Sequence, residues 1–119
     1  MTTVSTVDSG QHVRGARYLH LAGDWRSATG RGVRVAIVDS GIDGSHPDLH
    51  GRVIESVEAR VDNKRIVFDP SESGDSAGHG TACAGIISRI APDAELYSIK
   101  VLGSAGLGDG QAFLAGLEY

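Results

Sequence analysis

The chain is 119 residues long, and its 40% hydrophobic and 22% charged residues are ordinary for a globular protein. This length corresponds to one domain or to part of one. A net charge of −4 at pH 7 and the absence of any Lys/Arg cluster exclude a typical nucleic-acid-binding surface. No apolar run could span a membrane, the N-terminus lacks a signal-peptide pattern, and a single cysteine, Cys83, excludes an internal disulfide, so we expect a cytoplasmic protein.

The first part of the chain predicts a helix, a buried strand and a hairpin. Apolar residues recur with helical spacing from Val13 to Thr29, and Gly30 occupies the position of a C-terminal cap. Val33–Val38 is a nearly continuous aliphatic run, which is typical of a strand covered on both faces. Arg52–Val61 and Ile66–Phe68 flank a polar turn and predict a β-hairpin.

The second part predicts a loop, a helix, a strand and the start of another helix. The loop covers Asp69–Gly78, and the helix covers His79–Ile90 with one apolar face formed by Cys83, Ile86, Ile87 and Ile90. Leu96–Leu102 has strand character, and Gln111–Tyr119 begins a helix that has no capping residue at its end. Strands that alternate with helices predict an α/β fold, in which a mostly parallel sheet carries helices on its faces.

Two residues stand where a catalytic pair would be expected. Asp39 ends the best strand, and ligands and catalysis gather outside the carboxyl ends of parallel strands. His79 begins a helix between two glycines, where the helix dipole favours a neutral imidazole that can act as a base. Taken singly, Asp39 is more often a turn or capping residue, and an isolated histidine is more often structural.

The surroundings of both residues resemble the motifs of one protease family. Val35–Asp43 resembles the aspartate motif of the subtilisin-like serine proteases, or subtilases. His79-Gly80-Thr81, followed by Ala84-Gly85, resembles their histidine motif. The order, aspartate before histidine, is the subtilisin order. Three further segments match: His46-Pro47-Asp48-Leu49, Ala91-Pro92 and Lys100-Val101-Leu102-Gly103.

The resemblance covers roughly Trp25 to Tyr119 and implies a fold and an activity. It implies a three-layer, subtilisin-like α/β fold with a mostly parallel sheet, of which residues 13–119 are the N-terminal portion. The residues themselves indicate a flexible arm at positions 1–12. The implied activity is that of a serine-type endopeptidase, in which His79 is the general base and Asp39 orients it. The implied partners are a peptide or protein substrate and the missing C-terminal part, which carries the nucleophilic serine and the oxyanion asparagine. Without that part, we expect the chain to be inactive.

The glycine-rich segment before the last helix is the candidate substrate-binding segment. Gly106, Leu107 and Gly108 match the family's segment that pairs with an extended peptide, and the mechanism would be strand addition to an exposed backbone edge. Two alternatives stay open. One is a non-catalytic peptide-binding or partner module that uses this same edge. The other is a nucleotide-binding domain, although the spacing is GxxGxG rather than GxGxxG.

The sequence also departs from the family. Cys83 lies four residues after His79, so a bulky thiol reagent there is expected to displace the histidine, unless Cys83 is only a small buried residue. Asp48 matches a calcium ligand, but the loop that supplies most of the other oxygens is absent, so we predict no calcium there, no metal and no cofactor. A zinc alternative would use Asp43, His46, His50 and His79. Ser40, Ser45 and Ser104 are nucleophile candidates by residue type alone.

Overall fold

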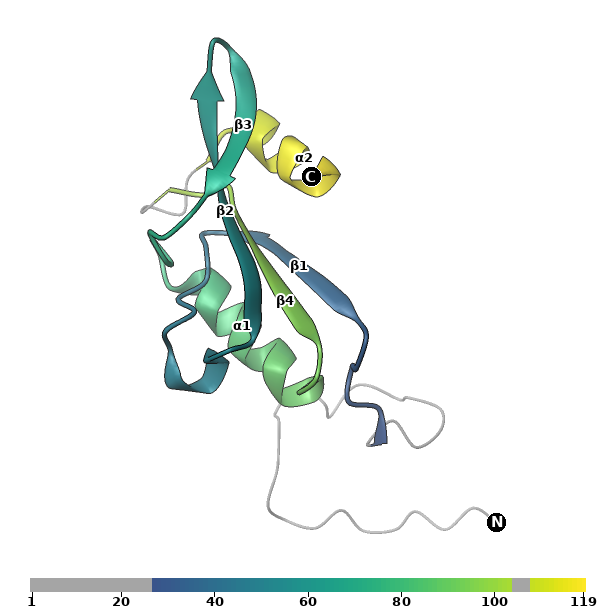
Figure 1. Ribbon diagram of the computed structural model, residues 1–119. Coiled ribbons are helices and arrows are strands. Elements are labelled where there is room, and N and C mark those ends of the chain that lie inside the picture. Colours follow the sequence, from purple (N-terminus) through teal and green to yellow (C-terminus); the bar gives the residue numbers. More distant parts are fainter. Residues whose placement is uncertain (1–26, 104–107) are drawn as a thin grey trace, which may run out of the picture.

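The computed structural model describes residues 27–103 and 108–119, which form a four-stranded sheet with a helix on each face (Figure 1). In chain order the elements are β1 (Arg34–Asp39), the short 3-10 helix η3 (Pro47–Leu49), β2 (Val53–Asp62), β3 (Arg65–Pro70), α1 (His79–Ile90), β4 (Glu95–Lys100) and α2 (Gly110–Glu118). The arm predicted for residues 1–12 and most of the helix predicted for Val13–Thr29 lie outside the described residues.

The strand order is β1-β4-β2-β3, and the first three strands are parallel. Strand β3 adds an antiparallel edge through its pairing with β2. Asp39 is opposite Lys100 in the register of β1 and β4, so the carboxyl ends of these two strands lie side by side. The predicted α/β class with a mostly parallel sheet is confirmed.

The predicted hairpin is present, and its first strand has a second role. Asn63 and Lys64 connect β2 to β3 with φ angles of 48° and 63°, the left-handed conformations of a tight turn that suits the twist of a hairpin. Strand β2 also pairs in parallel with β4, with a register shift between Val53 and Glu55. One strand of the hairpin is therefore a central strand of the sheet, while the turn end extends beyond β1 and β4 (Figure 1).

Two apolar clusters lie on opposite faces of the sheet, as the alternation of side chains along a strand requires. Ile37 and Leu96 face α1 and pack with Ala84, Leu49 and Ile42. On the other face, Val57, Ile99 and Val101 pack with Ala112 of α2. Helix, sheet and helix form the three expected layers.

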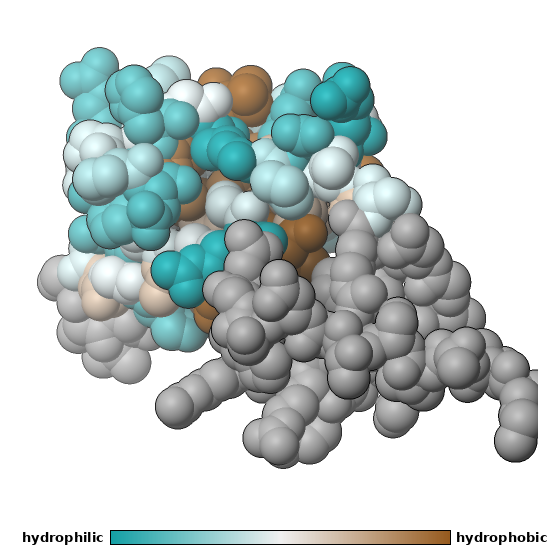
Figure 2. Space-filling model, turned by 90° about the horizontal axis from the view of Figure 1, so that it is seen from below, coloured by the Kyte–Doolittle hydropathy of each residue, from teal (hydrophilic) through white to brown (hydrophobic). Residues whose placement is uncertain are grey.

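The buried face of α1 differs from the predicted one. Gly80, Ala84 and Ser88 are its buried residues, whereas Ile86 and Ile90 are 56% and 41% exposed. The predicted apolar face is therefore wrong for these two isoleucines. Small side chains at positions i, i+4 and i+8 let the helix axis approach the sheet closely, and this close packing decided the orientation. In the view from below, hydrophobic groups show between polar ones on the described surface (Figure 2).

Helix α2 is only partly covered. The Asp109 side chain caps it by accepting a hydrogen bond from the Gln111 N–H at 2.8 Å. Its Leu114 and Leu117 side chains are 57% and 62% exposed.

Within residues 27–103 and 108–119, no helix has the length and apolar character that crossing a bilayer requires.

Candidate active site

Asp39 is held at the carboxyl end of β1 by its own neighbour. The Ser40 N–H donates a hydrogen bond to Asp39 Oδ1 at 2.7 Å, and the carboxylate side chain is 14% exposed. Partial burial alone would raise the pKa of Asp39, but hydrogen bonds from Ser40 and His79 outweigh it and hold that pKa below its ordinary value. Asp39 is therefore an oriented anion.

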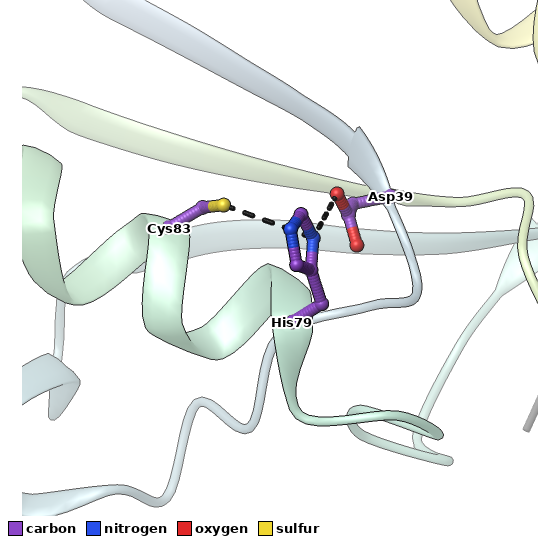
Figure 3. Close-up of side chains that lie close together, drawn as sticks. All are labelled: Asp39, His79 and Cys83. Atoms are coloured by element: carbon purple, nitrogen blue, oxygen red, sulfur yellow. Dashed lines mark hydrogen bonds and ion pairs between the residues drawn. The ribbon is translucent and has the colours of Figure 1, made fainter. Parts of the chain in front are cut away.

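His79, the first residue of α1, lies next to this anion. Its Nδ1 is 2.8 Å from Asp39 Oδ2, and its side chain is 70% exposed (Figure 3). A carboxylate can only accept a hydrogen bond, so the neutral imidazole carries its proton on Nδ1 and its lone pair on Nε2. This arrangement leaves Nε2 free to take a proton from a nucleophile, which is what a general base in acyl transfer must do.

A pair of glycines permits this distance. A Cβ at Gly80 would lie 2.0 Å from the Gly41 carbonyl oxygen, so no side chain fits at this position. Gly41 itself has a φ of 101°, a conformation that disfavours other residues. The start of α1 therefore rests directly on the backbone that follows β1, which places His79 beside Asp39.

Asp75 is a site residue that the sequence analysis missed. Its carboxylate accepts hydrogen bonds from the Ser40 hydroxyl at 2.7 Å and from the Thr81 N–H at 2.8 Å. It also accepts from the N–H groups of Ala77 and Gly78, at 3.0 and 2.8 Å. A signal was available: an Asp shortly before a helix start can cap that helix when the N-cap position, here Gly78, has no side chain.

Low pH is expected to destabilise the fold because it protonates the carboxylates of Asp75 and Asp39. Burial alone would raise the pKa of Asp75, but hydrogen bonds from Thr81 and Ser40 hold it far below its ordinary value. Because the folded pKa is depressed, this stabilisation is present above the unfolded value of about 3.9 and is lost as pH falls below it. Urea unfolding at pH 6 and at pH 3 should show the loss, and Asp75→Asn should reduce the difference without abolishing it, because the pKa of Asp39 is also lowered. Equal pH dependence in both proteins would contradict this.

Cys83 approaches the same imidazole from the next turn of α1. Its Sγ lies 3.8 Å from His79 Nδ1, and the thiol is partly buried (Figure 3). One ligand atom each from Asp39, His79 and Cys83 lie within 4.8 Å of one another, a donor set of oxygen, nitrogen and sulfur that zinc accepts. A metal there would compete with the Asp39–His79 hydrogen bond.

A bulky maleimide attached to Cys83 is therefore expected to push His79 away from Asp39. In the complete serine protease that the sequence resemblance implies, we expect peptide hydrolysis to fall about 100-fold, the effect of misplacing a reacting group by about 1 Å. The measurement is peptide hydrolysis before and after modification, with the extent of labelling verified by mass spectrometry. The Cys83→Ser enzyme should keep its activity under the same treatment. Full activity of the modified wild type would show that the thiol can be modified without moving the imidazole.

The other candidates from the sequence are placed less decisively. Gly106 and Leu107 lie outside the described residues, and so does Ser104. A Cβ at Gly108 would lie 2.5 Å from the Val101 carbonyl oxygen, so this glycine packs against the chain that follows β4. A substrate-binding role for this segment stays a prediction.

Two further sequence candidates have other contacts. The Ser40 hydroxyl is bonded to Asp75 and the Ser45 hydroxyl to Asp43, at 2.5 Å in the latter case. Within the part of the chain that the structure describes, the side chains close enough to share a metal ion are those of Asp39, His79 and Cys83. They are not the predicted zinc ligands Asp43, His46, His50 and His79. The absence of calcium at Asp48 stays a prediction.

Comparisons with known proteins show the family of the chain. The family described as the subtilase family matches residues 30–118. An intracellular serine protease of Paenibacillus polymyxa is 36% identical over 115 residues, covering 89% of this chain and 34% of its own length. Subtilisin E of Bacillus subtilis (strain 168) is 40% identical over 103 residues, covering 76% of this chain and 24% of its own length.

Thermitase of Thermoactinomyces vulgaris is 35% identical over 105 residues, covering 80% of this chain and 35% of its own length. The chain thus spans about a third or less of the length of these relatives. The family match includes both Asp39 and His79, whose side chains form the hydrogen-bonded pair at the carboxyl end of β1. The chain belongs to the subtilase family.

Proposed function

We propose that this chain supplies the aspartate and the histidine of a serine-type endopeptidase, and that a segment outside it supplies the nucleophilic serine. The observation that carries the proposal is the 2.8 Å contact between His79 Nδ1 and Asp39 Oδ2, made by a histidine whose side chain is 70% exposed. Because Nδ1 is bonded to Asp39, Nε2 is the ring nitrogen left to meet a hydroxyl presented by another segment.

The residues present account for the proton transfers of the reaction. As the serine attacks a peptide carbonyl, His79 Nε2 takes the hydroxyl proton, and Asp39 stabilises the resulting imidazolium. His79 then gives this proton to the leaving amine, which leaves an acyl-enzyme that water hydrolyses through the same steps. The substrate would be an extended peptide, held by strand addition at Gly106–Gly108.

The partly covered α2 fits a chain that needs a complement. Leu114 and Leu117 are each more than half exposed, at 57% and 62%. Exposed apolar side chains in one helix favour burial against further protein, and the relatives extend well beyond the length matched here. We infer that the remaining portion of the protease domain covers this face, and that the chain alone does not hydrolyse peptides.

The test compares the chain alone with the chain completed by the remaining portion of a subtilase domain. A fluorophosphonate probe should label the completed enzyme and not the chain alone, and His79→Ala should abolish labelling and hydrolysis of a fluorogenic peptide. His50→Ala, which removes an exposed histidine after η3, is the matched control and should keep both activities. Labelling of the isolated chain, or hydrolysis that survives His79→Ala, would overturn the proposal.

A further inference from the structure

We propose that Asp75 is a positioning residue that sets the geometry of the Asp39–His79 pair by tying together the two backbone segments that carry them. The inference deepens the proposed function and rests on it for its kinetic consequence. Asp75 is not in hydrogen-bond contact with the imidazole; it acts through Ser40, Gly78 and Thr81.

The first tie is to the start of α1. A helix begins with N–H groups that have no partner within it, and here the N-cap position is Gly78, in a left-handed conformation with no side chain to offer. Asp75 Oδ1 accepts hydrogen bonds from the N–H groups of Ala77 and Gly78, and Oδ2 accepts one from the Thr81 N–H at 2.8 Å. The carboxylate thus fixes the turn from which the His79 side chain projects.

The second tie is to the end of β1. Ser40 is fully buried, and its hydroxyl donates to Asp75 Oδ1 at 2.7 Å while accepting the Gly80 N–H at 3.2 Å. The backbone N–H of Ser40 donates to Asp39 Oδ1 at 2.7 Å. A single residue, Ser40, therefore connects Asp75 to the Asp39 carboxylate, through its hydroxyl on one side and its backbone N–H on the other, and its hydroxyl also binds the residue next to His79.

Thr81 makes a second link between the same two segments. Its hydroxyl donates to Asp75 Oδ2 at 2.5 Å and accepts the Asp43 N–H at 3.0 Å. Ser76, next to Asp75, adds a bond from its own N–H to the Ser40 carbonyl at 3.1 Å. The chain after β1 and the first turn of α1 are joined at several points, and Asp75 accepts bonds from both segments.

The chemistry of these contacts requires a carboxylate. Both oxygens of Asp75 accept from more than one donor, and an ionised carboxylate has about four acceptor sites and no hydrogen to place against them. The side-chain amide of an asparagine at this position would offer only one oxygen, and its NH₂ group would face the N–H or O–H donors that now bind the second carboxylate oxygen. The hydrogen bonds that lower the pKa of Asp75 keep it in the acceptor-only form, and its charge is favourable at a helix N-terminus.

The test replaces Asp75 by Asn and uses Asp109→Asn as the matched control, because the Asp109 carboxylate also accepts a hydrogen bond from an N–H at a helix start, that of Gln111 in α2. The first measurement is ¹⁵N NMR of the His79 imidazole in this chain, which reports whether the proton is on Nδ1 or Nε2. The second is kcat and KM for peptide hydrolysis by the completed enzyme. For Asp75→Asn we expect loss of the single Nδ1-protonated tautomer and a fall in kcat of about 10- to 100-fold, with little change in KM. Asp109→Asn should change neither.

Two further variants keep the proposal testable if Asp75→Asn does not fold, as judged by loss of helical circular dichroism. Thr81→Val removes the hydroxyl and should reproduce the altered tautomer and the lower kcat, whereas Thr81→Ser retains the hydroxyl and should restore both. A change in melting temperature alone, with tautomer and kcat as in the wild type, would overturn the positioning role. If the completed wild-type enzyme hydrolyses no peptide, the proposed function fails, but the tautomer measurement on the chain still decides the role of Asp75.

Discussion

Asp39→Asn is expected to lower the kcat of the completed enzyme by about four orders of magnitude, the scale known for loss of the triad carboxylate. The two side chains are nearly equal in shape, so the effect comes from the proton on the histidine. The Ser40 N–H donates to Asp39 Oδ1 and will hold the amide oxygen of Asn in its place. The amide NH₂ then faces His79 Nδ1, which must accept and therefore moves its proton to Nε2. An imidazole protonated on Nε2 cannot take a proton from the serine.

The kinetic measurement has a spectroscopic companion and a control. The ¹⁵N spectrum of His79 should show the Nε2-protonated tautomer in Asp39→Asn. Asp62→Asn, which alters an aspartate on the exposed end of the hairpin, should leave kcat unchanged. A kcat within about tenfold of the wild type would mean that Asp39 does not orient the histidine, and the proposed mechanism would then be wrong.

Gly80→Ala should impair both the fold and the activity. The added Cβ would lie 2.0 Å from the Gly41 carbonyl oxygen, which is a backbone atom and cannot rotate away. The start of α1 must therefore move off the end of β1, and His79 moves with it. We expect the free energy of unfolding to fall by about 1–3 kcal/mol, which is typical of an overpacked site, and kcat to fall about 100-fold or more.

The same helix provides the matched control for Gly80→Ala. A Cβ at Gly85 would meet nothing within 4 Å, so Gly85→Ala should stabilise the protein by about 0.5–1 kcal/mol through helix propensity alone. Urea unfolding measures both variants. Equal effects of the two substitutions would show that propensity, and not the contact with Gly41, controls this position.

The predictions from sequence were most accurate where the physical cause is local. The aliphatic run before Asp39 became β1, and the polar turn at Asp62–Arg65 became the turn of the hairpin. The face of α1 was predicted from hydrophobicity and was wrong for Ile86 and Ile90. The prediction placed the most hydrophobic side chains of α1 against the sheet. In the structure the small residues of α1 face the sheet instead, because they allow the helix to approach it closely.

The sequence by itself determined the four strands and two α-helices of the described residues, the family resemblance and the two candidate catalytic residues, because strand and helix ends depend on neighbours within a few positions. Only the tertiary structure decided that Asp39 and His79, 40 positions apart, approach to 2.8 Å. It also decided the function of Asp75, which in the sequence is one acidic residue in a polar loop. The contacts of Asp75 with Ser40, 35 positions away, form only when α1 rests on the backbone that follows β1. Long-range contacts of this kind leave no periodic pattern in a sequence, and they bring the residues of this site together.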